Sequence, residues 1–425
     1  MDEETATVEG MASMPRAKRW LVLGACLIVS AANLIRPPLW LLTPEFPAQA
    51  FGASWERFWN ISAASTIALM VFILAGGVLG DLYGRRRVLI IGAGGYLAAV
   101  TLAAASTTPA WFYLFSTLAG ICAALTIPLA VALIRLNFAE RELPYAFALF
   151  TVGTAVASLL ASVLGGPIKA IFGWRALFAL PVGLGLAGLA LALRGLPESH
   201  ARSGYRPRDA IGIAAWSGVI LAMVFGLIEV RVAGLAAPVA WVSLVVAAVG
   251  VAVLLWWEHV TPGPVLRDPP FPRAMLSIII LTGMVMSFAM VGYALQLFSF
   301  LQTSQGYGPV LGGLALTPLL IGLILTALPT ARGLGRVPAR QLIAGGLGLM
   351  LLAMLLTALS VLTLGAGTPY LILAAGLVLF GAGYGAANTA WNTLYMGSVP
   401  EALAGLSAAI SSAAGQIGGV IAGTA

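Results

Sequence analysis

Few ionisable side chains lie within the long apolar stretches of this 425-residue chain, and those few limit its chemistry. Arg36 lies inside such a stretch, directly before Pro37 and Pro38, and Glu45 lies near the end of the same stretch. A desolvated Arg can bind an anionic group, and a carboxylate with changing exposure can carry a proton. We expect Arg36 to face a cavity; the alternatives are that it reaches the outer surface or that it pairs with Glu45. Glu45 is either a proton carrier or a solvated carboxylate at the rim.

Uncharged polar and aromatic side chains form a second group with helical spacing. Trp391 and Asn392 follow Asn388 by three and four residues, so the three side chains share one helix face. That face also carries Tyr384 and Tyr395, and a similar stripe earlier in the chain comprises Tyr293, Gln296 and Phe300. Such faces either hydrogen-bond to a neighbouring helix or contact a ligand. Around Arg36 the candidates are Asn33 and Trp40, the latter as an aromatic wall or an interfacial anchor.

Covalent, metal or cofactor chemistry is not expected. The chain has no phosphate-binding loop of the form G-x-x-x-x-G-K-[ST], and a glycine cluster at 92–95 lacks the spacing of a dinucleotide site. Cys26 and Cys122 both lie in apolar runs, which is typical of small core residues rather than of a disulfide or a metal site. We predict that the protein is not an enzyme.

The composition predicts a polytopic membrane protein. Hydrophobic residues make up 60% of the chain and charged residues 9%, and the mean hydropathy is +1.00. These values exclude an ordinary soluble domain and a disordered chain. The net charge of +7 is spread over short clusters, so a nucleic-acid partner is not expected.

The apolar runs predict thirteen membrane spans, because a bilayer core needs about 20 apolar residues per helix. The predicted spans are 20–44, 58–80, 88–106, 110–134, 144–171, 175–195, 210–230, 238–257, 273–301, 309–330, 341–363, 369–396 and 402–425.

Basic residues predict how the spans are oriented. The polar residues 1–19 precede an apolar run that is too long for a signal peptide, so we expect a first span with a cytoplasmic N-terminus. With that orientation, most of the 22 Lys and Arg residues fall in cytoplasmic segments, as the positive-inside rule requires. Contact with anionic lipid head groups is an additional role for them.

Two short basic loops indicate an internal repeat. The loops 80–87 and 333–340 each follow the second span of a set, and the same offset carries the first span onto the ninth. We expect a cytoplasmic tail at 1–19, a six-helix bundle at 20–196, linkers with an inserted hairpin at 197–272, and a C-terminal bundle at 273–425. Two related bundles with a site between them are typical of transporters. The second bundle has five spans in the sequence, so either the chain is truncated or a fourteenth helix is absent.

The first basic loop carries the longest motif in the chain. Residues 77–89 read Gly-Val-Leu-Gly-Asp-Leu-Tyr-Gly-Arg-Arg-Arg-Val-Leu. Gly77 permits close helix packing, and Gly84 permits a tight turn. We expect Asp81 either to pair with Arg85 or Arg86, or to lie at a helix N-terminus of the other bundle. This pattern resembles the loop between helices two and three of the major facilitator superfamily, and the resemblance implies a conformational switch.

Further segments resemble the fourteen-helix drug:proton antiporter branch of that superfamily. They include Gly173-Trp174-Arg175, the run from Gln302 to Pro318, and the run from Pro400 to Gly419. The chain departs from the branch where an Arg in helix four is replaced by Ser116, where a Gly-Pro in helix five is replaced by Ala161-Ser162, and where an Asp in helix one is replaced by Ile35.

The resemblance implies an all-α membrane protein of the major facilitator fold. It implies a protein of the bacterial cytoplasmic (inner) membrane that exports small amphipathic molecules by alternating access. It also implies that this export is coupled to protons. Small molecules and lipids are the expected partners, and we expect a monomer. Two alternatives stay open, namely an organic-anion facilitator or exchanger centred on Arg36, and a non-transporting receptor that retains the fold.

Overall fold

The computed structural model describes residues 15–35, 55–199, 210–233, 238–260, 273–399 and 403–424. Within these ranges the chain is helical and contains no strand. Long helices are expected here, because a backbone inside a bilayer has no water to satisfy its polar groups. Arg36, Trp40 and Glu45 lie outside the described residues, as does most of the predicted second half of the first span.

The N-terminal bundle contains the first six spans. Their helices are α2 (Arg16–Leu34), α5 (Trp55–Tyr83), α6 (Arg85–Ala105), α7 (Pro109–Asn137), α8 (Leu143–Phe172) and α9 (Ala179–Gly195). A short 3-10 turn, η1 (Trp174–Phe178), leads into α9. Gly84 begins α6 with a φ of +103° and Gly173 ends α8 with a φ of +79°, both conformations that favour glycine.

The C-terminal bundle contains the remaining spans after the inserted pair. Its helices are α12 (Arg273–Thr303), α13 (Pro309–Ala315), α14 (Thr317–Gly333), α15 (Ala339–Leu364), α16 (Tyr370–Ser398) and α17 (Ala404–Thr424), with the 3-10 turn η2 (Gly365–Gly367) after α15. The single span predicted at 309–330 is interrupted at Leu316. Pro318 in the first turn of α14 has no amide hydrogen to continue the α13 ladder, which accounts for the break.

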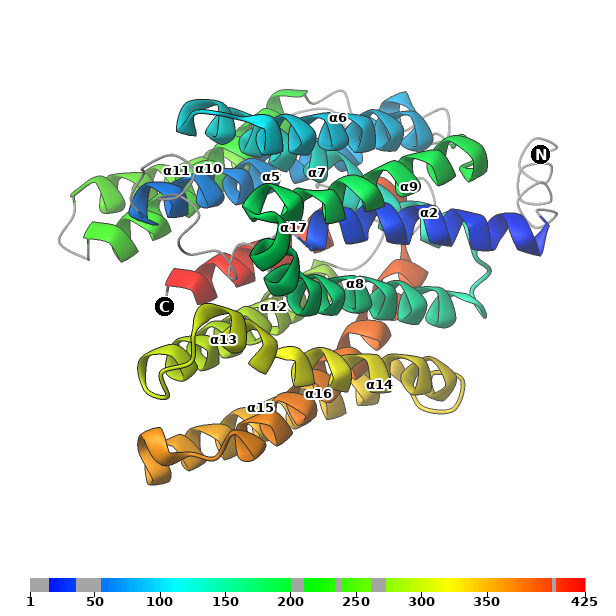
Figure 1. Cartoon of the computed structure of the whole chain (residues 1–425). Coiled ribbons are helices and arrows are strands. Elements are labelled where there is room, and N and C mark those ends of the chain that lie inside the picture. The colour runs from blue at the N-terminus through cyan, green and yellow to red at the C-terminus, as the bar shows by residue number, and fades with distance from the viewer. Residues whose placement is uncertain are drawn as a thin grey trace.

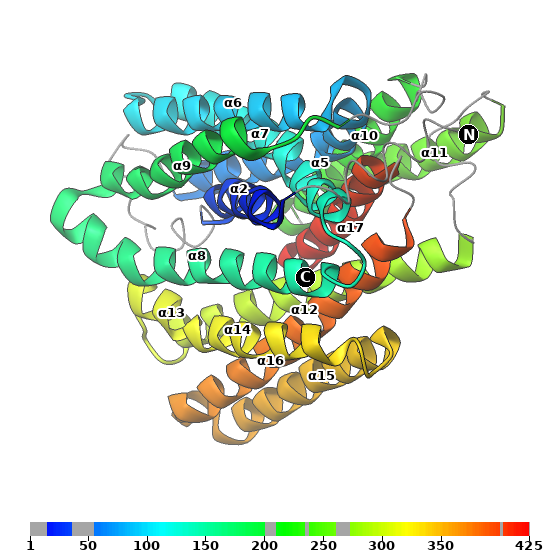
Figure 2. The ribbon, with the colours of Figure 1, turned by 90° about the vertical axis from the view of Figure 1, so that its right-hand side faces the viewer.

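In the described part of the chain, eleven helices are long and apolar enough to cross a membrane. The inserted pair, α10 (Ala210–Ala233) and α11 (Pro238–Val260), contains shorter apolar stretches. Both views place α10 beside α5 and α17 (Figures 1 and 2). Met70, Ile220, Val224 and Val420 form an apolar cluster there, so α10 contacts both bundles.

The two bundles meet along α8, α5 and α17. In Figures 1 and 2, α8 lies between α2 of the N-terminal bundle and α14 of the C-terminal bundle. The largest cluster of buried side chains continues from Leu133 and Ile134 on α7 to Met396 in the last turn of α16 and Val399 directly after that helix. The bundles are therefore joined by a shared apolar core at that end.

Glycines let neighbouring helices approach closely, which accounts for part of the 50 glycines in the chain. On α15 and α16, a methyl group at Gly346 would lie 2.6 Å from Gly383 O and 2.8 Å from the Ala387 Cβ atom. At the adjacent Gly345, a methyl group would meet nothing within 4 Å. The two neighbours form a matched pair for testing the contact.

We predict that Gly346→Ala destabilises the protein, whereas Gly345→Ala does not. Overpacking a tight contact costs about 1–3 kcal/mol, while Gly→Ala at an open helix position is neutral or stabilising by up to about 1 kcal/mol. Thermal unfolding of the purified protein in detergent, followed by tryptophan fluorescence, measures both. Equal melting temperatures for the two variants would contradict the α15–α16 contact.

Candidate functional site

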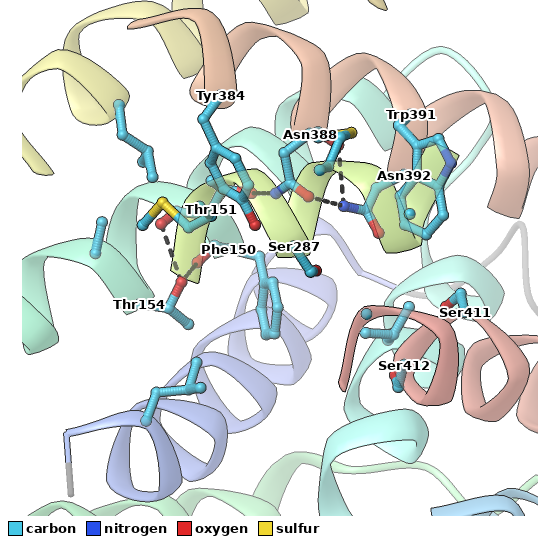
Figure 3. A pocket seen from close by; sticks show the side chains of 18 of the residues that line it. Phe150, Thr151, Thr154, Ser287, Tyr384, Asn388, Trp391, Asn392, Ser411 and Ser412 are labelled. Atoms are coloured by element: carbon cyan, nitrogen blue, oxygen red, sulfur yellow. Dashed lines mark hydrogen bonds between the residues drawn. The ribbon is translucent and has the colours of Figure 1, made fainter. Parts of the chain in front are cut away.

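A cavity of about 360 Å³ lies between the two bundles. Its wall comes from α8 of the N-terminal bundle and from α12, α16 and α17 of the C-terminal bundle, with two residues from α14 and single residues from α2 and α7. Figure 3 shows Tyr384, Asn388 and Asn392 on one stretch of α16, with Thr151 and Thr154 of α8 across from them. The volume lies at the lower end of the range of small-molecule sites.

Amide and hydroxyl groups provide the polar lining. Asn388 Nδ2 donates to Thr151 Oγ1 across the two bundles at 3.4 Å, and Asn392 Nδ2 donates to Asn388 Oδ1 at 3.1 Å. Thr154 and Ser158 donate to carbonyls of their own helix, so that their oxygens keep acceptor capacity. The aromatic lining consists of Phe150, Tyr384 and Trp391. None of the lining residues in the described part of the chain carries a formal charge.

The structure brings together only some of the residues that the sequence nominates for substrate binding. Asn388, Trp391 and Asn392 line the cavity. Arg36 and Trp40 lie outside the described residues, so the structure does not place them.

Three other nominated residues lie elsewhere. Asn33 donates to Val29 O and to Thr126 Oγ1 of α7, inside the N-terminal bundle. Tyr293 bonds to Thr357 at 2.7 Å and stacks on Phe380 at a ring distance of 4.5 Å, inside the C-terminal bundle. Gln296 is exposed and does not line the cavity. Tyr293 and Asn33 therefore join helices within one bundle, which is the alternative role of such polar groups.

Sequence reasoning missed the part of the lining that comes from α8, α12 and α17. On α8 the signal was present, because Thr151, Thr154 and Ser158 recur at helical spacing in an otherwise apolar segment. Ser287 of α12 is an isolated hydroxyl, and Ser411 and Ser412 lie in a run of small residues, so neither helix carries a distinctive pattern. Phe150 and Met290 look like ordinary apolar residues in the sequence and line the cavity only through the tertiary fold.

The 77–89 motif lies at a second meeting point of the bundles, which we call the arginine-rich end because it carries Arg85, Arg86, Arg87 and Arg135. Arg85 Nε donates to Asp81 Oδ1 at 2.7 Å, and the two side chains are only 2% and 3% exposed. The other carboxylate oxygen of Asp81 accepts from Leu406 N at 3.0 Å, in the first turn of α17. Asp81 thus makes both of the contacts that the sequence offered as alternatives.

Two glycines allow this approach. A methyl group at Gly405 would collide with the carboxylate of Asp81, and one at Gly77 would collide with Gly405 O and lie 2.6 Å from the Ala409 Cβ atom. The first amides of a helix have no partner within the helix and carry a partial positive charge. A carboxylate placed there by the other bundle satisfies them and is itself stabilised.

Arg86 and Arg87 contact the last turn of α9 and the segment after it instead of Asp81. Arg86 donates from its side chain to Leu193 O at 3.0 Å and from its backbone to Glu198 Oε1 at 3.2 Å. The guanidinium Nε of Arg87 lies 3.5 Å from Glu198 Oε2, with 72% of the arginine side chain exposed. The three consecutive arginines therefore have different environments, and the buried one pairs with Asp81.

We predict that Arg85→Gln destabilises the protein much more than Arg87→Gln. Removing one partner of a buried pair costs about 3–5 kcal/mol because the other charge stays buried, whereas an exposed pair contributes about 0–1 kcal/mol. Thermal unfolding in detergent gives the melting temperatures of the two variants, each of which has lost one positive charge. Similar melting temperatures would show that the Asp81–Arg85 pair is not desolvated.

Comparisons with known proteins place the chain in a family. The family model described as Major Facilitator Superfamily matches residues 21–423. The chain is 27% identical to the probable actinorhodin transporter of Streptomyces coelicolor, over 95% of this chain and 71% of that protein. It is 26% identical to the tetracenomycin C resistance and export protein of Streptomyces glaucescens, over 100% of this chain and 78% of that protein. It is 27% identical to the multidrug resistance protein Stp of Mycobacterium tuberculosis, over 94% of this chain and 72% of that protein.

Solved structures with the same fold agree with this assignment. The crystal structure of the human organic anion transporter MFSD10 superposes with a TM-score of 0.69 at 16% identity, covering 97% of this chain and 93% of that one. The proton:xylose symporter XylE superposes with a TM-score of 0.67 at 14% identity, covering 96% and 88%. At these identities the likeness concerns the fold alone. The family match and the fold together show that the chain is an all-α membrane transporter, not an enzyme, and that it belongs to the major facilitator superfamily.

Proposed function

We propose that this transporter exports small amphipathic, drug-like molecules by alternating access, and that its cavity takes substrates without a net negative charge. The observation that carries this proposal is the lining of the inter-bundle cavity. It combines three aromatic side chains with amides and hydroxyls, and its described lining residues carry no formal charge. A full charge bound in a low-dielectric cavity needs an opposite charge as partner, whereas aromatic faces and amides bind uncharged molecules without one.

The relatives support export as the direction and drugs as the cargo. Their names assign them the transport of actinorhodin, resistance to and export of tetracenomycin C, and resistance to multiple drugs. We place the N-terminus and the arginine-rich end in the cytoplasm of a bacterial cell, in its inner membrane, because basic loops stay on the cytoplasmic side. The inter-bundle contacts then close the cytoplasmic end of the protein.

Coupling to protons is the energy source that we propose. Of the acidic residues in or near the spans, Glu45 is our candidate proton carrier, while Asp81 is already engaged by Arg85 and by α17. Substrate-driven switching of Asp81 is part of the same proposal, with Gly77, Gly84, Arg85 and Arg86 as the other residues of the conformational-switch motif at the α5–α6 junction. The working unit is a monomer in a lipid bilayer.

We predict that Asn388→Leu lowers transport of tetracenomycin C by roughly three- to tenfold, the size expected for one lost hydrogen bond. The assay is transport of the compound by protein reconstituted in proteoliposomes with an imposed pH gradient. Asn137→Leu is the matched control, because the Asn137 amide bonds to Leu133 O at the end of α7, away from the cavity. Wild-type activity of Asn388→Leu, or an equal loss in Asn137→Leu, would show that the cavity is not the substrate site.

The same proteoliposomes separate drug:proton antiport from anion transport centred on Arg36. We expect efflux of tetracenomycin C to rise with the imposed pH gradient and to lose this dependence in Glu45→Gln. Efflux that ignores the gradient, together with an Arg36→Ala variant that loses transport of an anionic dye but not of a cationic one, would establish the anion transporter instead.

A further inference from the structure

Arg135 makes a contact between the bundles that lies outside the 77–89 motif. It occupies the last turn of α7, in the N-terminal bundle, and its side chain is buried with 9% of the residue exposed. Its Nε donates to Met396 O of α16, in the C-terminal bundle, at 2.6 Å. A charged group is costly to bury at this position unless it is hydrogen-bonded, so a specific compensation is required.

The end of α16 provides that compensation. Met396 lies in the last turn of the helix, where carbonyls lack intrahelical donors and carry a partial negative charge. Met396 O also accepts from Val399 N, at 3.4 Å, which is the longer of its two bonds. The guanidinium of Arg135 therefore caps the C-terminus of a helix that belongs to the other bundle.

Arg135 and Asp81 contact the two helix ends that flank the connection between α16 and α17. The segment between α16 and α17 spans residues 399–403, with α16 ending before it and α17 beginning after it. The cation of Arg135 lies at the negative end of α16, and the anion of Asp81 lies at the positive end of α17. Each charge matches the helix end that it contacts, and both charges come from the N-terminal bundle.

α16 also links this contact to the cavity. Asn388, Asn392 and Met396 follow one another at intervals of four residues, so they lie on one face of the helix. Asn388 reaches Thr151 of the N-terminal bundle within the cavity, and Met396 reaches Arg135 at the arginine-rich end. A rigid helix transmits a displacement at one of these positions to the other, because its backbone bonds fix the spacing.

We propose that Arg135 is a positioning residue of the transport cycle, which holds the arginine-rich end closed by capping α16 and must release Met396 O when that end opens. This inference rests on the alternating-access function proposed above. Its test measures the distance between the bundles in the absence of substrate. The result therefore does not depend on whether the protein transports drugs, and the two proposals can fail separately.

The experiment places spin labels on Glu140→Cys and Arg336→Cys, two exposed positions in loops of opposite bundles, after Cys26→Ala and Cys122→Ala. Pulsed dipolar spectroscopy on the full chain in lipid nanodiscs gives the distance distribution between the labels. Loss of one charge-assisted hydrogen bond is expected to raise the ratio of long to short distances about tenfold in Arg135→Gln. Arg135→Lys keeps the charge without the guanidinium geometry and is expected to lie between wild type and Arg135→Gln.

The matched control is Arg194→Gln, which removes an exposed arginine from the end of α9 in the same bundle. It is expected to leave the distribution unchanged. A wild-type distribution in Arg135→Gln would overturn the proposal, and so would an equal increase in Arg194→Gln. If Arg135→Gln yields no folded protein, Arg135→Lys decides the matter, since a wild-type distribution in that variant overturns the proposal.

Discussion

The desolvation of Asp81 is the constraint on which the rest of this structure depends. A carboxylate that is 3% exposed must be compensated, and part of its compensation comes from the other bundle. Arg85 supplies a positive charge from the first turn of α6, but Leu406 N reaches Asp81 only while α17 is docked against α5. If the arginine-rich end opens, the Asp81 carboxylate loses the hydrogen bond from Leu406 N and needs water in its place. The closed arrangement therefore has an electrostatic reason to persist, and a substrate must supply free energy to change it.

The charged groups that hold the two bundles together lie apart from the uncharged groups that line the cavity. Ionic groups that join the bundles lie at the arginine-rich end, while the described lining of the cavity is uncharged. A charged cavity would bind a counter-ion tightly and select for it, whereas aromatic and amide groups accept varied molecules with moderate affinity. This arrangement suits a transporter whose relatives are named for actinorhodin, for tetracenomycin C and for multidrug resistance. The helix α16 contributes to both regions, because Asn388 and Asn392 line the cavity and Met396 O accepts from Arg135.

Local sequence patterns predicted part of this structure well. The positions of the helices followed from the apolar runs, and the motif predicted both the turn at Gly84 and the close approach at Gly77. It did not distinguish Arg85 from Arg86 as the partner of Asp81, because that depends on the direction in which each side chain leaves α6. The break between α13 and α14 was missed for a similar reason, since a proline in an apolar run is compatible with a bent or an interrupted helix.

The cavity was less predictable than the helices. Periodicity identified the face of α16 that carries Asn388 and Asn392, but the same reasoning selected Tyr293, whose hydroxyl bonds to Thr357 within its own bundle. The spacing of polar residues in the sequence identifies one face of a helix, but it does not identify the helix or cavity that this face contacts. Arg135 directly follows the predicted span 110–134, and nothing in the sequence places the end of α16 beside it. Contacts between distant segments, here 261 residues apart, require the tertiary structure.

The most direct measurement is hydrogen exchange of the backbone amides at the beginning of α17, from Ala404 to Ser407. The amide of Leu406 is bonded to Asp81 of the other bundle, so its exchange rate reports the closed contact itself. We predict strong protection of this segment in the substrate-free transporter in lipid nanodiscs. We also predict faster exchange when saturating tetracenomycin C is present, with the exchange of the α15 segment from Gly346 to Ala353 unchanged. Equal protection at the beginning of α17 with and without the compound, under conditions in which it is transported, would contradict an opening of the Asp81 contact during transport.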